Sequence, residues 1–449
     1  MSASPAATLD RPRGPLERFL SPFGDVRGGE GLGTLLLALN AFLLLCAYYV
    51  IRPTREALIL AEAGAEVRTY SAAGQALMLL FLIPAYGRFA SRVSRIGLIT
   101  WVTLFFISNL AIFYVLGQAK VPNLGVAFFL WVGVFNVMIV AQFWAFANDL
   151  YTPEQGKRLF ALIAVGASAG ASLGPQIARL LIKPLGVFTP MLVSAAILGL
   201  CILVSRIIHR REGAGHGVQG QAVDQNAPLG KEGGFQLVWR ERYLLYIAFL
   251  ILLLNAVNTT GEYILAKTVT RAAEHALTGG GASMGAEDFK KQFIGLFYAD
   301  FQGWVNGIGL LAQLFLVSRV MKWFGVRVAL FVLPLIALGG YALLATVPLL
   351  GLIRTVKIAE NATDYSLNNT VRHALFLPTS REAKYKAKAA IDSFFWRAGD
   401  MASAGLVFVG SMLRLDTRGF AWANFAFTLL WLWIVIRIVR EHRKLTAEA

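Results

Sequence analysis

The sequence predicts an all-α, polytopic membrane protein with twelve transmembrane helices in two six-helix repeats. Three observations predict this class: an apolar composition, long apolar windows that recur along the chain, and a similarity between its two halves. Of the 449 residues, 57% are hydrophobic and 15% are charged, whereas soluble chains carry about 25% charged residues. The composition therefore excludes an ordinary soluble protein.

Apolar windows of about 20 residues, the length that crosses a bilayer as a helix, recur throughout the chain. In the fifth window a small residue stands at every fourth place, at Gly166, Gly170 and Gly174, a pattern typical of a close-packing seam between helices. The tenth window carries several charges. The twelve windows lie near 32–51, 69–90, 97–117, 123–148, 159–182, 187–208, 243–266, 292–317, 326–346, 350–373, 387–411 and 418–438.

Three polar segments lie outside these windows. Residues 1–31 are expected to form a flexible cytosolic leader, and residues 439–449 a cytosolic tail. Residues 209–242 are polar and rich in glycine, which predicts a disordered cytosolic linker. The linker separates an N-terminal six-helix half, 32–208, from a C-terminal six-helix half, 243–438.

Basic residues gather in the loops that follow even-numbered spans, which predicts a cytoplasmic location for these loops and for both termini, in the cell (inner) membrane. This topology also explains the net charge of +16, so nucleic acid is not expected as a partner. Two basic loops match each other in the two halves, and they either gate or brace the cytosolic side or act only as topology signals. Their residues are Arg88, Arg92 and Arg95 in the first half and Arg319 and Lys322 in the second.

The two halves resemble repeats of one another. At an offset of 227 residues, Gln75 matches Gln302, Thr152 matches Thr379, and two further positions agree. Parallel six-helix repeats around a central cavity are the architecture of major-facilitator carriers. The sequence therefore predicts a major-facilitator-like arrangement.

The tenth window is too polar to face lipid. Its charges at Lys357, Glu360 and Asp364 cost roughly 8–10 kcal/mol at mid-bilayer, while its Leu, Ile and Val residues return about 3 kcal/mol. Such a segment must face a wet or substrate-filled cavity. At about 100° per residue one helical face collects a stripe suited to a polar ligand. The stripe consists of Lys357, Asn361, Asp364, Asn368 and Arg372.

Span one ends in three charged residues, Arg52, Arg55 and Glu56. Arg52 and Glu56 stand four residues apart and can pair on one helical face, which leaves Arg55 as a surplus cation. Arginine suits phosphate or carboxylate because its planar fork donates two bonds at once. The group is either an anion clamp or a set of interfacial charges that ends the span.

Two further spans carry candidate cavity groups. In span seven, Asn255 and Glu262 lie on one helical face, and Glu262 is a coupling carboxylate, a counter-charge to Lys357, or part of a structural ion pair. In span eleven, Lys388 and Asp392 are expected in the cavity. The neighbouring Arg397 and Asp400 are expected to form a structural pair.

The sequence shows no metal-ligand cluster and no nucleophile–base arrangement. We therefore expect neither an enzyme nor a cofactor. The expected partners are a small anionic substrate and membrane lipid.

Several stretches together resemble the nucleotide transporter family, the ATP/ADP exchangers of plastids and intracellular bacteria and their relatives. That resemblance implies a major-facilitator-like exchanger that relies on basic groups near span one, acids in spans four and seven, and a lysine opening span eleven. Arg52 or Arg55, Glu262 and Lys388 fit three of these, while span four has no carboxylate before Asp149. The stretches are Arg52–Leu58, Phe143–Asn148, Gly156–Phe160, Asp364–Asn368 and Lys384–Asp392.

These observations favour an alternating-access transporter that exchanges nucleotides or a related phosphorylated anion. A proton-coupled symporter or exporter of another solute, with Glu262 or Asp364 as the proton carrier, is the first alternative. The second alternative is a membrane sensor or assembly partner that transports nothing.

Overall fold

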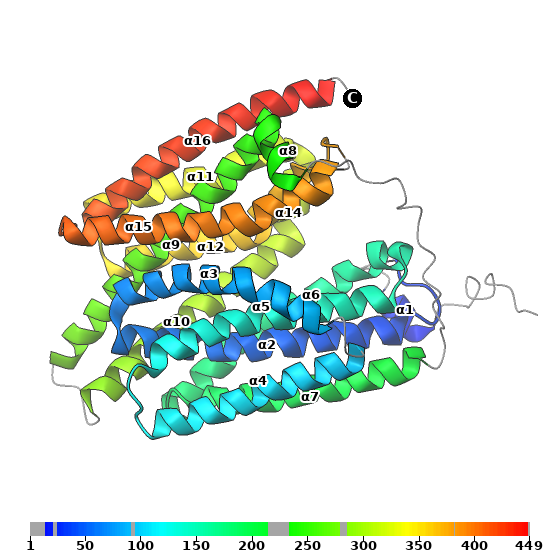
Figure 1. The fold of residues 1–449 in the computed structure, drawn as a ribbon, viewed down its shortest axis with the longest axis horizontal. Coiled ribbons are helices and arrows are strands. Elements are labelled where there is room, and N and C mark those ends of the chain that lie inside the picture. The colour runs from blue at the N-terminus through cyan, green and yellow to red at the C-terminus, as the bar shows by residue number, and fades with distance from the viewer. Residues whose placement is uncertain are drawn as a thin grey trace, which may run out of the picture. The chain divides into compact units, whose positions relative to one another are not determined.

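The computed structural model describes residues 14–20, 25–90, 95–213, 233–278, 285–380 and 382–447, and their regular structure is helical throughout (Figure 1). Within these ranges, eight helical stretches are long and apolar enough to cross a membrane. The predicted all-α membrane class is confirmed. The spans predicted near 69–90, 350–373 and 387–411 are also helical but are not among these eight stretches.

The first six predicted spans coincide with six long helices, and most of these extend beyond the predicted bounds. The short α1 (Pro15–Leu20) precedes them, within the predicted leader. The six helices are α2 (Gly31–Glu62), α3 (Gly64–Ala90), α4 (Arg95–Gln118), α5 (Leu124–Leu150), α6 (Pro153–Leu185) and α7 (Thr189–Gly213).

The second six spans follow α8 (Gly234–Arg240), a short helix inside the predicted linker. The linker residues 214–232 lie outside the described residues. The later helices are α9 (Arg242–Thr278), α10 (Ala286–Leu311), α11 (Val317–Thr346), α12 (Leu350–Thr363), α13 (Asn369–Ala374), α14 (Lys388–Ala390), α15 (Trp396–Met412) and α16 (Thr417–Ala447).

Several of the C-terminal helices are joined by π-helical turns instead of loops. Gly325, with φ of 70°, breaks the helical geometry within α11, at the point between the eighth and ninth predicted spans. A π-turn adds a residue to the helical turn and is common at functional sites. The π-turns are η2 (Ala312–Leu316), η3 (Asp364–Asn368), η4 (Ala383–Ala387) and η5 (Ile391–Phe395).

The chain divides into two compact units. Unit 1 comprises residues 1–55, 81–124 and 131–223, and unit 2 comprises 56–80, 125–130 and 224–449. Unit 2 thus includes the turn between α2 and α3, because that turn packs against later helices. Within unit 2, α9, α11, α15 and α16 pack side by side (Figure 1).

The small-residue seam of span five packs against α2 inside unit 1. A Cβ atom built on Gly166 would lie 2.4 Å from the Ala38 carbonyl oxygen, and one on Gly170 would lie 2.1 Å from the Phe42 carbonyl oxygen. Only glycine allows the two backbones to approach so closely. The sequence pattern therefore predicted this helix contact correctly.

Candidate functional site

The polar stripe of the tenth span lies inside unit 2. The exposed fractions are 0% for Lys357, 4% for Glu360, 4% for Asn361, 7% for Asp364 and 4% for Asn368. Helix α12 and the turn η3 therefore bury the charges that could not face lipid. These side chains form ion pairs or hydrogen bonds with other side chains of unit 2.

Lys357 is held by polar groups of two helices. Its Nζ lies 2.8 Å from Glu360 Oε2 and 3.9 Å from Glu262 Oε1, and it donates to Asn258 Oδ1 at 2.9 Å. Tyr341 of α11 donates to the same Glu360 oxygen at 3.1 Å. A buried lysine so enclosed is a structural centre of unit 2.

Glu262 links this centre to the end of α2. Asn361 Nδ2 donates to Glu262 Oε1 at 2.9 Å, and Arg68 Nη2 lies 3.6 Å from Glu262 Oε2. Arg68 also donates from Nε to Glu56 Oε2 at 2.6 Å. Sequence reasoning missed Arg68, which stands immediately before the second predicted span. A chain of alternating charges thus runs from Glu56 to Glu360.

The arginines of span one lie in unit 1. The Arg52 guanidinium stacks 5.3 Å from the centre of the Tyr49 ring, and Arg55 is 8% exposed. Their role as an anion clamp remains a prediction.

Asn255 takes part in a contact between α9 and α15. It donates from Nδ2 to Asp400 Oδ1 at 2.8 Å and to the Trp396 carbonyl oxygen at 2.7 Å. Arg397 lies 3.4 Å from Asp400 Oδ2, as expected of a structural pair. The amide of Asn255 is therefore occupied by protein partners.

Two ion pairs that sequence reasoning missed fasten the α2–α3 turn to α9 and α10. Glu62 Oε1 lies 3.0 Å from Lys291 Nζ, and Glu66 Oε1 lies 3.0 Å from Lys267 Nζ. Tyr263 donates to the same Glu66 oxygen at 2.8 Å. None of these four charged residues belongs to a polar stripe in the sequence, because each lies outside the predicted spans.

A cavity of about 230 Å³ opens beside α13 and α14 in unit 2. Arg372, Lys388 and Asp392 line it, together with the rings of Phe376 and Trp396. The structure thus brings together three of the residues predicted from the sequence. Asn369, His373 and Ile251 complete the lining.

The cavity carries surplus positive charge. Lys388 Nζ lies 2.5 Å from Asp392 Oδ2, so these two charges balance. Arg372 lies 4.9 Å from the centre of the Trp396 ring and donates to Asn369 Oδ1 at 3.2 Å. Among the described residues no carboxylate pairs with Arg372, and its Nε is buried without a hydrogen-bond partner. A bound anion would balance the charge of Arg372 and accept a hydrogen bond from its Nε.

The two predicted gating residues of the second half, Arg319 and Lys322, do not line this cavity. Arg319 and Lys322 are exposed, and Arg319 donates to the Phe315 carbonyl oxygen of the preceding turn η2. Arg92 lies outside the described residues, as do the side chains of Arg88 and Arg95.

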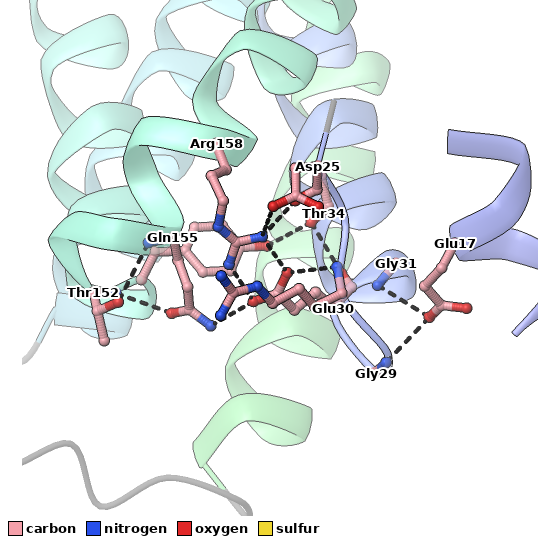
Figure 2. Close-up of polar contacts among 11 residues, drawn as sticks. Glu17, Asp25, Gly29, Glu30, Gly31, Thr34, Thr152, Gln155 and Arg158 are labelled. Carbon is pink, nitrogen blue, oxygen red and sulfur yellow. Dashed lines mark hydrogen bonds and ion pairs between the residues drawn. The ribbon is translucent and has the colours of Figure 1, made fainter. Parts of the chain in front are cut away.

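The Gly156–Phe160 stretch has a bracing role in unit 1. Figure 2 shows the Arg158 guanidinium directed at Glu30 and Asp25, with Nη2 2.9 Å from Glu30 Oε1. Gln155 also donates to Glu30 Oε1, at 3.1 Å. The start of α6 is thereby tied to the segment before α2. Asp25 and Glu30, which belong to the predicted leader, therefore contact α6 through Arg158.

The contacts of Glu30 lower its pKa. Burial raises the pKa, but hydrogen bonds from Arg158, from the Arg27 backbone N–H and from Gln155 outweigh burial, so the net pKa lies below the ordinary value of 4.5. A lowered pKa contributes stability above the unfolded-state value, and this contribution disappears as the pH falls through the folded-state value.

Replacing Glu30 with glutamine should therefore lower the thermal stability by an amount that depends on pH. We expect a loss of about 1.5–3 kcal/mol at pH 7, typical of hydrogen bonds to charged groups, and a loss that shrinks as the pH falls below about 4.5. Thermal unfolding of the two proteins between pH 3.5 and 7 measures this difference. Glu154→Gln, at an exposed position in the first turn of α6, should show no comparable loss. A pH-independent loss for Glu30→Gln would contradict the assignment.

Comparison with known proteins agrees with this fold. Among curated proteins, ADP,ATP carrier protein 1 of Chlamydia trachomatis serovar D is 23% identical over 343 residues, which cover 66% of this chain and 61% of the relative. The protein of the same name from Chlamydia muridarum is 24% identical over 341 residues, with the same coverage. The matched region thus spans less than two thirds of these relatives.

Solved structures resemble the chain over nearly its whole length. The nucleoside transporter NupG superposes with a TM-score of 0.60 at 12% identity, covering 91% of this chain and 98% of its own. A POT family transporter in complex with a thioalcohol-conjugated peptide gives 0.63 at 13% identity, covering 92% and 97%. At these identities the likeness shows the fold alone. A family model described as Major Facilitator Superfamily matches residues 37–360. Because that match covers more than half of the chain, and the helical membrane fold agrees with it, the protein belongs to the Major Facilitator Superfamily of membrane transporters.

Proposed function

We propose that this transporter exchanges nucleotides, or closely related phosphorylated anions, across the membrane. The observation that carries the proposal is the cavity in which Arg372 and Lys388 face two aromatic rings. The names of the curated relatives, ADP,ATP carrier proteins, support the same substrate class. The proposal describes a carrier and requires no covalent chemistry.

The cavity offers complementary groups for both parts of a nucleotide. The Arg372 fork can donate two bonds to a phosphate, and Lys388 adds a compact positive charge. The faces of Trp396 and Phe376 provide apolar surface on which a base can stack. Each ring already has a cation close to it. Arg372 lies 4.9 Å from the centre of the Trp396 ring, and Lys388 Nζ lies 5.8 Å from the centre of the Phe376 ring.

Asp392 gives Lys388 a charge partner when no substrate is bound. Without an anion, the Asp392 carboxylate neutralises Lys388 at 2.5 Å. A bound phosphate would take over that lysine, and its departure would return the lysine to Asp392.

We assign the buried charged group around Lys357 on α12 a supporting role in this proposal. Lys357 is fully buried and surrounded by Glu360, Glu262 and Asn258. The cavity beside this group has a volume of about 10 Å³, too small for a nucleotide. The charged group around Lys357 therefore supports the helices that carry Arg372, and the ligand contacts are those of the larger cavity.

Nucleotides should raise the thermal stability of the detergent-solubilised protein. A ligand that binds only the folded state stabilises it by about 2.7 kcal/mol at 100 times its Kd. A panel of nucleotides with different bases and phosphate numbers, screened by thermal shift, identifies the preferred substrate. Arg372→Ala should lose the shift, whereas Arg319→Ala, at an exposed position, should keep it. A shift of equal size in Arg372→Ala, or no shift with any nucleotide in the wild type, would count against the proposal.

A further inference from the structure

Helix α8 packs against the part of span eleven that carries Lys388 and Asp392. It lies beside α14 in Figure 1, and within unit 2 it packs against η4, α14 and α9. Leu237 and Val238 of α8 are 1% and 0% exposed, so this helix is anchored in the protein. The last part of the predicted linker therefore packs on the elements that line the cavity of about 230 Å³.

Each of the three short elements at the start of span eleven touches α8. A Cβ atom built on Gly234 would lie 2.4 Å from the Lys386 carbonyl oxygen in η4 and 3.4 Å from the Ala390 Cβ atom in α14. Only glycine allows so close an approach to the Lys386 backbone. The Phe235 ring lies 5.3 Å from the Phe394 ring of η5 at an angle of 85°, an edge-to-face geometry that aromatic pairs prefer.

These contacts fall on the two π-turns that set the direction of Lys388. This residue begins α14 directly after η4, and Asp392 lies in η5. A π-turn holds one residue more than an α-turn, so its loss rotates the residues on one side of it by about 100° relative to those on the other. In the present register both side chains line the cavity together with Trp396, which begins α15. Loss of η5 would therefore turn Lys388 away from Trp396.

The residues that follow α8 contact a second element of the cavity. Tyr243 stands three residues after α8, is 5% exposed and donates to the Leu375 carbonyl oxygen at 2.8 Å. Leu375 directly follows α13, which carries Arg372, and it directly precedes Phe376, which lines the cavity. The stretch from α8 to Tyr243 therefore contacts the elements that carry Arg372 and Lys388.

We infer that α8 is a positioning element of this cavity. Gly234 and Phe235 hold η4 and η5, and so hold the register in which Lys388 faces the cavity. Neither of them is among the described residues that line it, so they act through Lys388 and Asp392. An anion that must meet two cations loses affinity steeply when one of them moves by about 1 Å. The consequence for nucleotide binding rests on the proposed function, whereas the register itself does not.

The register is tested without a substrate by labelling a thiol in place of Lys388. Lys388→Cys is made in a background of Cys46→Ala and Cys201→Ala, which removes the chain's two cysteines. Arg319→Cys in the same background reports on an exposed position outside the cavity. Adding Gly234→Ala should change the rate at which a maleimide labels Lys388→Cys by at least about threefold, because thiol labelling follows exposure. It should leave the labelling rate of Arg319→Cys unchanged.

Gly233→Ala is the matched control, because a Cβ atom on Gly233 would meet no described atom nearer than Gln236 Oε1, at 3.9 Å. It should leave both labelling rates unchanged. Phe235→Ala removes the contact with Phe394 and should reproduce the effect of Gly234→Ala, which guards against misfolding of a single variant. Phe235→Tyr keeps the ring and should keep the labelling rate of the unaltered background.

Nucleotide exchange in liposomes gives the second readout. Gly234→Ala should raise the nucleotide concentration that gives half the maximal rate about 10-fold, with a smaller change in the maximal rate per inserted protein. Gly233→Ala should change neither quantity. A loss of folded carrier, by contrast, lowers the maximal rate and leaves the half-saturating concentration unchanged.

The two readouts separate this inference from the proposed function. Unchanged labelling of Lys388→Cys by both Gly234→Ala and Phe235→Ala would overturn it, and so would equal changes at Lys388→Cys and Arg319→Cys, which indicate a general loosening of the fold. If no nucleotide is exchanged but labelling behaves as expected, the proposed function fails and positioning by α8 stands. If the wild type exchanges nucleotides and Gly234→Ala does so with an unchanged half-saturating concentration, positioning by α8 fails and the proposed function stands.

Discussion

Replacing Lys388 with alanine is expected to abolish anion exchange while leaving the protein inserted in the membrane. The substitution removes the cation that lies 2.5 Å from Asp392 and leaves that carboxylate facing the cavity. A phosphate would lose one charge-assisted contact, which is typically about 1.5–3 kcal/mol, or about 10- to 150-fold in affinity. Repulsion by the uncovered carboxylate adds to the loss. Uptake of labelled nucleotide into liposomes, normalised to inserted protein, measures the effect.

Lys384→Ala is the matched control for this experiment. Lys384 stands four residues before Lys388, carries the same charge and is exposed. Its replacement should leave uptake within about twofold of the wild type, a difference of about 0.4 kcal/mol. Wild-type uptake by Lys388→Ala, or equal losses in both variants, would remove Lys388 from the binding site.

Replacing Lys357 with methionine is expected to destabilise the protein by about 3–5 kcal/mol, because it leaves buried carboxylates without their cation. Lys357 is 0% exposed, and Glu360 beside it is 4% exposed. Adding Glu360→Gln to the same variant removes the unpaired charge and keeps an acceptor for Tyr341. The double variant should recover most of the loss. Thermal and denaturant unfolding in detergent measure all three proteins.

The surface pair of Lys444 and Glu441, 2.9 Å apart with Lys444 65% exposed, is the control for burial. Lys444→Met should cost at most about 1 kcal/mol. If Lys357→Met were as stable as Lys444→Met, the charged centre of unit 2 would not be buried in the folded protein.

The sequence was sufficient to predict the helices and to predict that the charges of the tenth span do not face lipid. It placed these charges in a wet or substrate-filled cavity, whereas Lys357 and Glu360 are enclosed by protein partners. The cost of Lys357, Glu360 and Asp364 in lipid depends only on their own chemistry, so their burial followed without any knowledge of neighbours. The same holds for Gly166 and Gly170, whose spacing shows that another backbone comes close. Lys388 and Asp392 lie one helical turn apart, and the structure brings them to one cavity with Arg372.

Contacts between distant segments were beyond the sequence. Arg68 joins Glu56 to Glu262, yet nothing in the sequence around it indicates a partner almost 200 residues away. The α2–α3 turn packs with unit 2, where Glu62 and Glu66 meet lysines of α9 and α10. The π-turn at Asp364–Asn368 was likewise not predicted from the sequence. Such features depend on packing, which one sequence does not display.

The most direct test of the central claim is counterflow in liposomes that contain the purified protein. Liposomes preloaded with unlabelled ADP are placed in labelled ATP at equal pH, and the trapped label is followed with time. The account predicts rapid accumulation of label that depends on internal nucleotide and disappears in Lys388→Ala and Arg372→Ala. Uptake that ignores internal nucleotide, or no uptake by a folded wild type with any nucleotide of the panel, would contradict exchange through the cavity at Arg372 and Lys388.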